Sequence, residues 1–132
     1  MTGAPQRPTI RLASPAGEGG AGEDQVRGEV MTYLKINNWI VARIEQRMGM
    51  TKGTPDLIAG KNGRAIWIEL KSRPGYTMTK TGHQRKIKEG VLSDDQRGFA
   101  LRWSITGIPV ILARSWRDVH RILVDLGIEN ND

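Results

Sequence analysis

Two short segments near the middle of the chain contain the residues whose types and spacing could do chemistry. They are Gly53-Thr54-Pro55-Asp56-Leu57 and Ile68-Glu69-Leu70-Lys71. Asp56 follows a Thr-Pro turn and opens an apolar run, whereas Glu69 and Lys71 close a second apolar run. Two carboxylates can bind a divalent cation, and a neighbouring lysine can orient a water molecule and offset phosphate charge. If the two runs are adjacent strands, the pattern therefore suits metal-assisted cleavage of a phosphodiester.

A hairpin would bring these residues together. The segment 60–63 contains Asn-Gly, a strong hairpin-turn signal, between a predicted strand over 57–59 and another over 64–71. Side chains alternate along a strand, so Glu69 and Lys71 share one face while Ile66, Ile68 and Leu70 face the core. Antiparallel pairing places the start of one strand opposite the end of the next. We therefore expect Asp56 to lie near Glu69 and Lys71.

Two polar residues on predicted helices are further candidates. Glu29 borders the apolar stripe of a predicted helix over 23–38, where a carboxylate is costly unless it is paired or bound to a metal. Gln96 shares the packing face of a helix that Ser93 caps and that runs to about Thr106. Its amide could hydrogen-bond the attacking water or a phosphate.

Each of these residues also has a purely structural interpretation. Glu69 and Lys71 could form a charge pair on a solvated strand face, and Asp56 could cap its turn. Glu29 could be a salt-bridged surface residue, and Gln96 an ordinary residue of a first helical turn. The functional hypothesis is favoured by the combination, because four independent structural explanations would all have to be true of residues that together match one active site.

Composition narrows the chemistry. The chain has 132 residues, the size of one domain, with no cysteine and two histidines far apart in sequence. A metal site must therefore use mainly oxygen ligands, which favours Mg²⁺ or Mn²⁺. No apolar run approaches the roughly 20 residues needed to cross a bilayer, so we expect a cytoplasmic protein without a membrane partner.

Positive charge is concentrated in one segment. The formal net charge is +6, and 71–90 contains six basic residues and one acid, a net +5. This segment fits a polyanion such as DNA, although a solvated loop without a partner would also explain it. The residues predicted to contact nucleic acid are Arg73, Lys80, Arg85, Lys86 and Lys88.

The chain divides into a disordered leader over 1–22, one domain over 23–128 and a tail over 129–132. The domain is expected to contain a helix, three strands, a helix, a strand and a last helix, with a long basic loop over 72–92. The elements not yet given are strands over 39–45 and 108–113 and a helix from Ser115 to Leu126. This order predicts an α/β fold.

Taken together, the residues resemble a known family. The matching features are Glu29, the Gly53-Thr-Pro-Asp56 turn, the Trp67-Ile-Glu69-Leu-Lys71-Ser strand end and the Ser93-Asp-Asp-Gln96 helix start. They are similar to the VRR-NUC domain, a branch of the PD-(D/E)XK nuclease superfamily found alone in phages and attached to DNA repair nucleases. The resemblance covers roughly residues 24–119. It implies a restriction-endonuclease-like αβββαβ core with a mixed central sheet flanked by helices, followed here by a C-terminal helix.

The resemblance also implies roles. Asp56 and Glu69 would bind Mg²⁺ or Mn²⁺, with the backbone carbonyl of Leu70 completing the coordination sphere. Lys71 would act on the nucleophilic water. Glu29 would be an auxiliary ligand and Gln96 a helper on the facing helix. Stand-alone members are similar to homodimeric nucleases that resolve Holliday junctions, which implies a structure-selective homodimer working inside a bacterial host cell if the gene is of phage origin.

Three functions therefore stand at this point. The first is a metal-dependent DNA endonuclease acting on branched, junction or flap DNA. The second is a restriction or nicking nuclease, for which the sequence offers no dedicated base-reading element. The third is a non-catalytic nucleic-acid-binding module that uses the basic segment 73–88. Such a module has no use for two acids beside a phosphate, because without a metal they repel it.

Overall fold

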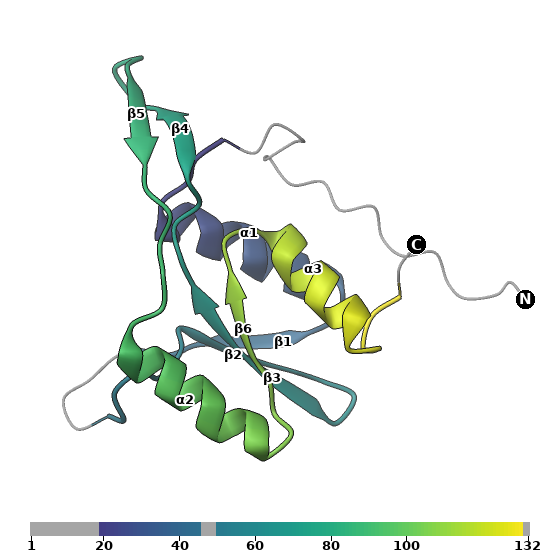
Figure 1. Ribbon diagram of the computed structural model, residues 1–132. Coiled ribbons are helices and arrows are strands. Elements are labelled where there is room, and N and C mark those ends of the chain that lie inside the picture. The colour runs from purple at the N-terminus through teal and green to yellow at the C-terminus, as the bar shows by residue number, and fades with distance from the viewer. Residues whose placement is uncertain (1–18, 46–49, 131–132) are drawn as a thin grey trace, which may run out of the picture.

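A mixed four-stranded sheet of order β1-β2-β3-β6 organises the part of the chain that the computed structural model describes, residues 19–45 and 50–130 (Figure 1). Strands β1, β2 and β3 are antiparallel neighbours, and β3 pairs with β6 in parallel. The elements are α1 (Glu23–Ile36), β1 (Ile40–Arg43), β2 (Leu57–Lys61), β3 (Arg64–Leu70), β4 (Gly75–Met78), β5 (Gln84–Ile87), α2 (Asp94–Ile105), β6 (Val110–Ala113) and α3 (Trp116–Asp125). The α/β class is confirmed.

The β2–β3 hairpin forms where the sequence predicts it. Asn62 and Gly63 both have positive φ, 51° and 77°, as a two-residue turn between twisted strands requires. This turn fixes the register, so that Lys61 lies opposite Arg64 and Leu57 opposite Ile68. Ile68 is fully buried, and β3 turns the face predicted as core toward the interior.

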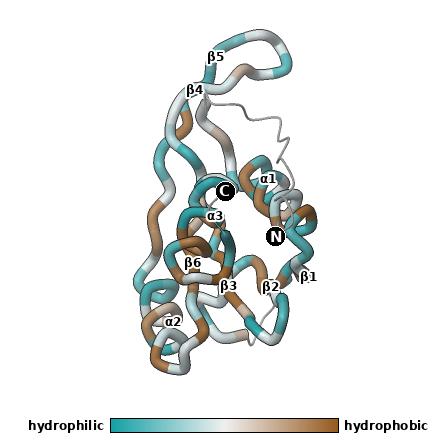
Figure 2. The backbone as a smooth tube through the Cα atoms, turned by 90° about the vertical axis from the view of Figure 1, so that its right-hand side faces the viewer, coloured by the Kyte–Doolittle hydropathy of each residue, from teal (hydrophilic) through white to brown (hydrophobic). Residues whose placement is uncertain are grey.

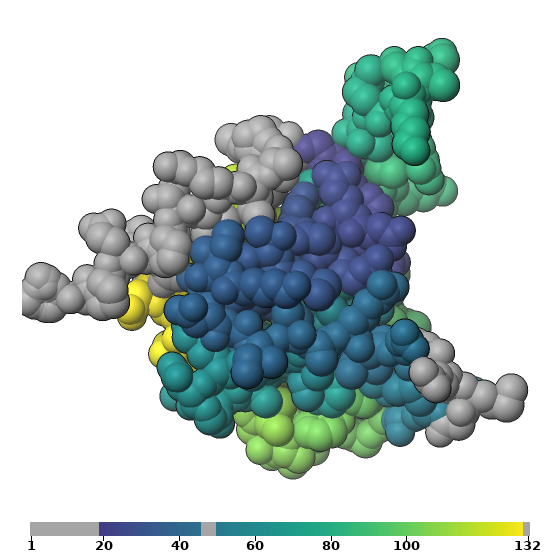
Figure 3. All heavy atoms as spheres, turned by 180° about the vertical axis from the view of Figure 1, so that it is seen from behind, coloured from purple at the N-terminus to yellow at the C-terminus, as the bar shows by residue number. Residues whose placement is uncertain are grey.

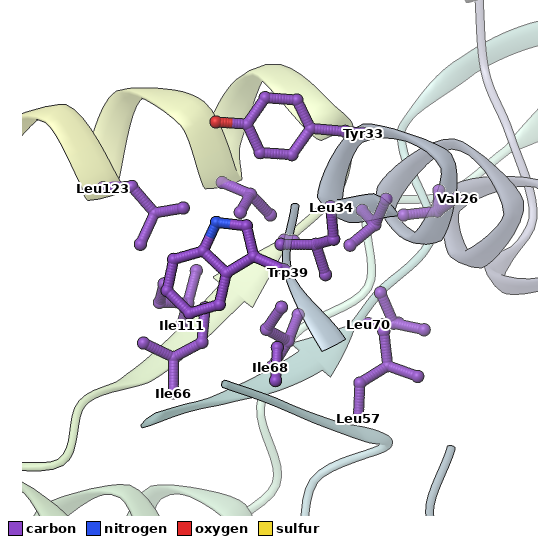
Figure 4. Close-up of a cluster of buried hydrophobic side chains, with 14 of the residues drawn as sticks. Val26, Tyr33, Leu34, Trp39, Leu57, Ile66, Ile68, Leu70, Ile111 and Leu123 are labelled. Carbon is purple, nitrogen blue, oxygen red and sulfur yellow. The ribbon is translucent and has the colours of Figure 1, made fainter. Parts of the chain in front are cut away.

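Helices α1 and α3 cover one face of the sheet, and α2 lies on the other (Figure 1). Side chains from α1, α3 and the central strands interlock in the core between them (Figure 4). The largest members of this core are Tyr33, Leu34, Trp39, Leu57, Ile66, Ile68, Leu70, Ile111 and Leu123. Burial of this apolar surface is the main force holding the helices to the sheet.

The opposite face of β3 packs on α2 through aromatic rings. Trp67 makes edge contacts with Phe99 and Trp103, with ring centroids 5.4 and 5.5 Å apart. The helix begins with a complete capping box between Ser93 and Gln96. Because α2 follows β3 and precedes β6, it forms the crossover that makes these two strands parallel.

The segment over 72–92, which the sequence predicts as a long loop, instead contains regular structure. It contains a two-stranded antiparallel sheet of β4 and β5, which extends beyond the sheet and helices (Figure 2). We call residues 75–88 the basic arm. The strand signal in the sequence is weak, because β4 alternates over only four residues and β5 contains a single apolar residue, Ile87.

Parts of the predicted leader and tail make contacts with the domain. Residues 1–18 of the predicted leader and 131–132 of the tail lie outside the described residues. Within 19–22, however, Ala21 is fully buried and pairs with Arg73. At the other end, the Glu129 carboxylate accepts hydrogen bonds from Trp39 Nε1 and Lys61 Nζ, both at 2.8 Å. No described helix is long and apolar enough to cross a membrane.

Candidate active site

The β2–β3 hairpin places Asp56 beside the end of β3. Continuing the register outward from Leu57 and Ile68 puts Asp56 directly opposite Glu69. The Asp56 Oδ2 atom accepts a hydrogen bond from the Leu70 N–H at 2.8 Å, and the Asp56 backbone carbonyl accepts one from the Ile44 N–H at 2.7 Å. The carboxylate is therefore held by the backbone of β3, and the main chain of Asp56 by the residue that directly follows β1.

Glu69 and Lys71 lie together, as strand alternation predicts. Lys71 Nζ is 4.0 Å from Glu69 Oε2, and the side chains are only 14% and 4% exposed. The other oxygen, Glu69 Oε1, is buried and has no hydrogen-bond partner among the described residues. A buried acceptor without a partner is costly, so this oxygen is a ready ligand for a donor or a cation.

The electrostatics of the pair are strongly perturbed. Burial is the main cause that raises the pKa of Glu69 from 4.5 to about 8. A hydrogen bond between the side chains of Glu69 and Asp56, and the negative charge of Asp56, raise it further. The Lys71 ammonium lowers this pKa without offsetting the burial, and Glu23 raises it slightly. Without a cation, Glu69 therefore keeps a proton near neutral pH, because its ionised form would be buried and would lie beside the charge of Asp56.

These features fit a divalent cation. A proton relieves the repulsion between Asp56 and Glu69, and Mg²⁺ or Mn²⁺ would relieve it more fully while also taking the unpartnered Glu69 oxygen. Both protein ligands would be carboxylates, which hard cations prefer. Within residues 19–45 and 50–130 there is no cluster of three or more acidic or histidine side chains suited to a metal. Backbone oxygen and water would therefore complete the coordination.

Gln96 lies at the start of α2, close to the turn that carries Asp56. Gly53 has φ +83°, and a Cβ there would lie against the Asp95 carbonyl and 2.8 Å from the Gln96 backbone nitrogen. The two segments are thus in direct contact. The Gln96 side-chain oxygen, however, accepts the Ser93 N–H at 2.8 Å, so the amide folds back on its own helix.

Glu29 has an ion-pair partner, which is one of the two settings that its burial allows. Both of its carboxylate oxygens accept hydrogen bonds from the Arg73 guanidinium, at 2.9 and 3.1 Å. Arg73 also donates to the carbonyls of Gly19 and Arg114, at 2.7 and 3.1 Å. Glu29 thus has the ion-pair partner that its burial demands.

Arg73 itself requires a correction. It was predicted to contact nucleic acid, but it is only 6% exposed and its guanidinium joins α1, the segment before α1 and the end of β6. A group held in this way is not available to a phosphate. The other four predicted contacts, Lys80, Arg85, Lys86 and Lys88, are exposed on the basic arm.

Sequence reasoning missed two residues around the site. Glu23 was interpreted only as a first-turn acid of α1, yet its charge acts on Glu69. Arg114 donates to the Gly90 carbonyl at 2.7 Å and pairs with Glu89 at 3.6 Å, which fastens the returning end of the arm next to β6. No local pattern pointed to either contact, since each joins elements distant in sequence.

Comparison of the chain with protein-family models, curated proteins and solved structures finds no match.

Proposed function

We propose that this protein is a metal-dependent DNA endonuclease of the VRR-NUC type. The observation that carries the proposal is the arrangement of Asp56, Glu69 and Lys71 at one end of the sheet. Two opposed carboxylates, one with an unpartnered oxygen, lie beside a lysine whose Nζ is 4.0 Å from Glu69. A purely structural charge pair would explain Lys71 and Glu69 but not the cost of placing Asp56 against the same buried carboxyl.

The roles follow from the chemistry of each group. Asp56, Glu69 and the Leu70 carbonyl would hold Mg²⁺ or Mn²⁺. The bound ion would supply positive charge to the phosphoryl oxygens as negative charge develops there. Lys71 orients the attacking water and offsets phosphate charge. Hydrolysis then adds the hydroxyl of that water to phosphorus and its proton to the departing sugar oxygen.

Two residues have supporting roles in this proposal. Since the Gln96 side-chain oxygen is engaged by Ser93, its amide nitrogen is the group that can donate to a phosphate oxygen. Glu29 acts by fixing Arg73, and therefore the segment that leads from Lys71 into the arm. The Mg²⁺ affinity of Glu29→Ala decides whether Glu29 is also an auxiliary metal ligand. We further propose branched DNA as the substrate and a homodimer as the working form, both on the family resemblance.

A non-catalytic DNA-binding module is the second candidate, favoured by the basic arm. Residues 75–88 contain Lys80, Arg85, Lys86 and Lys88 and no acid. Such an arm would bind the phosphate backbone with an affinity that falls steeply with salt. This candidate leaves Asp56 and Glu69 unexplained.

A gel assay distinguishes the two candidates. A labelled four-way junction, a flap, a duplex and a single strand are incubated with Mg²⁺, Mn²⁺ or a chelator and the wild-type protein, Asp56→Ala or Lys71→Ala. The control is Lys35→Ala, which removes an exposed lysine at the end of α1. Binding of each DNA is measured in parallel by fluorescence anisotropy.

We expect metal-dependent cleavage by the wild type and Lys35→Ala, and none by the two site variants, while all four proteins bind DNA. Lys71→Ala should bind about as tightly as wild type because the arm is unchanged. Equal cleavage by wild type and Lys71→Ala would defeat the assignment. Salt-sensitive binding without cleavage of any substrate would favour the binding module.

A further inference from the structure

Two large side chains on the basic arm are exposed to solvent. Tyr76 is 57% exposed and Met78 is 62% exposed. They are two residues apart on β4 and therefore share one face of the hairpin. Lys86 lies directly opposite Tyr76, and Gln84 lies opposite Met78. The arm thus presents two apolar groups beside a cation and an amide.

The backbone holds these side chains in a defined place. β4 is paired with β5 on one edge, and the Gly20 N–H donates to the Tyr76 carbonyl at 2.9 Å on the other. At the root, the Ser72 hydroxyl donates to the Lys88 carbonyl at 2.7 Å. A Cβ at Gly90 would be 3.1 Å from Lys71 Cβ, so the segment that returns from β5 passes against Lys71.

These anchors matter because an isolated two-stranded hairpin is barely stable in water. The tip is also closed, since the Thr79 N–H donates to the His83 carbonyl at 2.8 Å. In the space-filling view the arm extends past α1 as a separate lobe (Figure 3). Tyr76 and Met78 therefore contribute little to the core and are accessible to a partner.

The chemistry of the face identifies the partner. Residues 75–88 contain four basic residues and no acid, so a second arm of the same charge would be repelled. Unpaired nucleic-acid bases combine planar apolar faces with phosphate charge. Aromatic side chains stack on such bases whatever their sequence, and methionine is one of the side chains inserted between base steps.

The spacing of the two side chains also fits a base. Residues two apart on a strand are separated by about 6.6 Å. A stacked base occupies about 3.4 Å, so one base fits between two groups separated by twice that distance. Tyr76 and Met78 can therefore hold a single base between them, while Lys86, which lies opposite Tyr76, can meet its phosphates.

We propose that the Tyr76–Met78 face of the basic arm captures an unpaired DNA base. The choice of DNA rests on the proposed nuclease function, and the base capture rests on the arm. This contact would give the protein a means of preferring branched, gapped or flapped DNA over intact duplex without reading sequence.

The test measures binding in the presence of a chelator, so that cleavage plays no part. Fluorescence anisotropy compares an intact duplex with the same duplex containing a short single-stranded gap. The proteins are wild type, Tyr76→Ala, Tyr76→Phe and Met78→Ala. The double variant Leu101→Ala with Ile105→Ala removes two apolar side chains of similar exposure from α2 and serves as the matched control.

We expect Tyr76→Ala to bind gapped DNA roughly 5- to 150-fold more weakly, the range for the loss of one stacked base. Its affinity for intact duplex should change less than about twofold, since its cations remain. Tyr76→Phe keeps the ring and should restore the gapped-DNA affinity. Met78→Ala should lose part of it, and the α2 control should bind both DNAs as wild type does. The 2-aminopurine fluorescence of a base in the gap should change on binding wild type but not Tyr76→Ala.

Several results would overturn the proposal. One is unchanged discrimination between the two DNAs by Tyr76→Ala. Another is an equal loss of both affinities accompanied by a shift in gel-filtration elution, which would assign the face to self-association. Loss of binding to anionic vesicles without loss of DNA discrimination would assign it to a membrane. Tyr76-dependent binding of gapped DNA without cleavage would mean that the nuclease proposal is wrong while the base-capture proposal holds.

Discussion

Replacing Glu69 by glutamine should stabilise the metal-free protein, and more so as pH rises. The pKa of Glu69 is raised from 4.5 to about 8, chiefly by burial and then by Asp56. The folded protein therefore holds this proton more tightly than the unfolded chain does. Protonation of Glu69 therefore makes its full contribution to the free energy of unfolding below pH 4.5, and this contribution is lost as pH rises through about 8. Glutamine imitates the protonated carboxyl and cannot ionise.

The magnitude follows from the size of the shift. A difference of about 3.5 pKa units at 1.36 kcal/mol per unit gives an upper limit of about 5 kcal/mol. Between about pH 6 and about pH 9, the free energy of unfolding of wild type should fall by about 3 kcal/mol through this group alone. The Glu69→Gln protein should lack that fall.

Urea unfolding of both proteins in a chelator, followed by circular dichroism across this pH range, measures the difference. Glu89→Gln is the control, because Glu89 has a 56% exposed side chain and lies outside the carboxylate pair. The stability gap between Glu69→Gln and wild type should widen with pH, and that of Glu89→Gln should not. Parallel pH curves for wild type and Glu69→Gln would refute the electrostatic account of the site.

Four further outcomes are expected. Saturating Mg²⁺ should raise the thermal midpoint of wild type but not of Asp56→Ala, because only a folded state that binds the ion gains stability. At a Mg²⁺ concentration 100 times the dissociation constant, the free energy of unfolding should rise by about 2.7 kcal/mol. Glu29→Ala should lower the free energy of unfolding, measured in urea, by about 3 to 5 kcal/mol, because it leaves the buried Arg73 without its ion pair. An unchanged Mg²⁺ affinity of this variant, measured by calorimetry, would exclude a ligand role for Glu29. Gly53→Ala should lose at least about 1 to 2 kcal/mol from its positive φ alone, and cleavage rates should fall because the added methyl group separates the Asp56 turn from α2. Neutralising Arg85 and Lys86 to glutamine should reduce the slope of log affinity against log salt by about 1.8, whereas an unchanged slope would remove both from the phosphate contacts.

Local sequence determined the part of the candidate site that lies on β2 and β3. The Asn62-Gly63 turn sets the hairpin register, and the register sets which residues face one another. Asp56 and Glu69 therefore meet across neighbouring strands by rules that act over a few residues. The N-cap role of Ser93 is local in the same sense and was predicted, whereas the return bond from Gln96 that completes the capping box was not.

Contacts between distant segments decided the rest. Gly20, Ser72 and Arg114 hold the edge and root of the basic arm, and no local pattern in the sequence indicated these contacts. Arg73 looks like one cation in a basic run, yet it is buried against Glu29, 44 positions away. The sequence by itself determined which residues share a strand face or a helix start, since those follow from backbone periodicity. Only the tertiary structure decided which charges are buried together, and with them the raised pKa of Glu69, because desolvation depends on every element packed around a group.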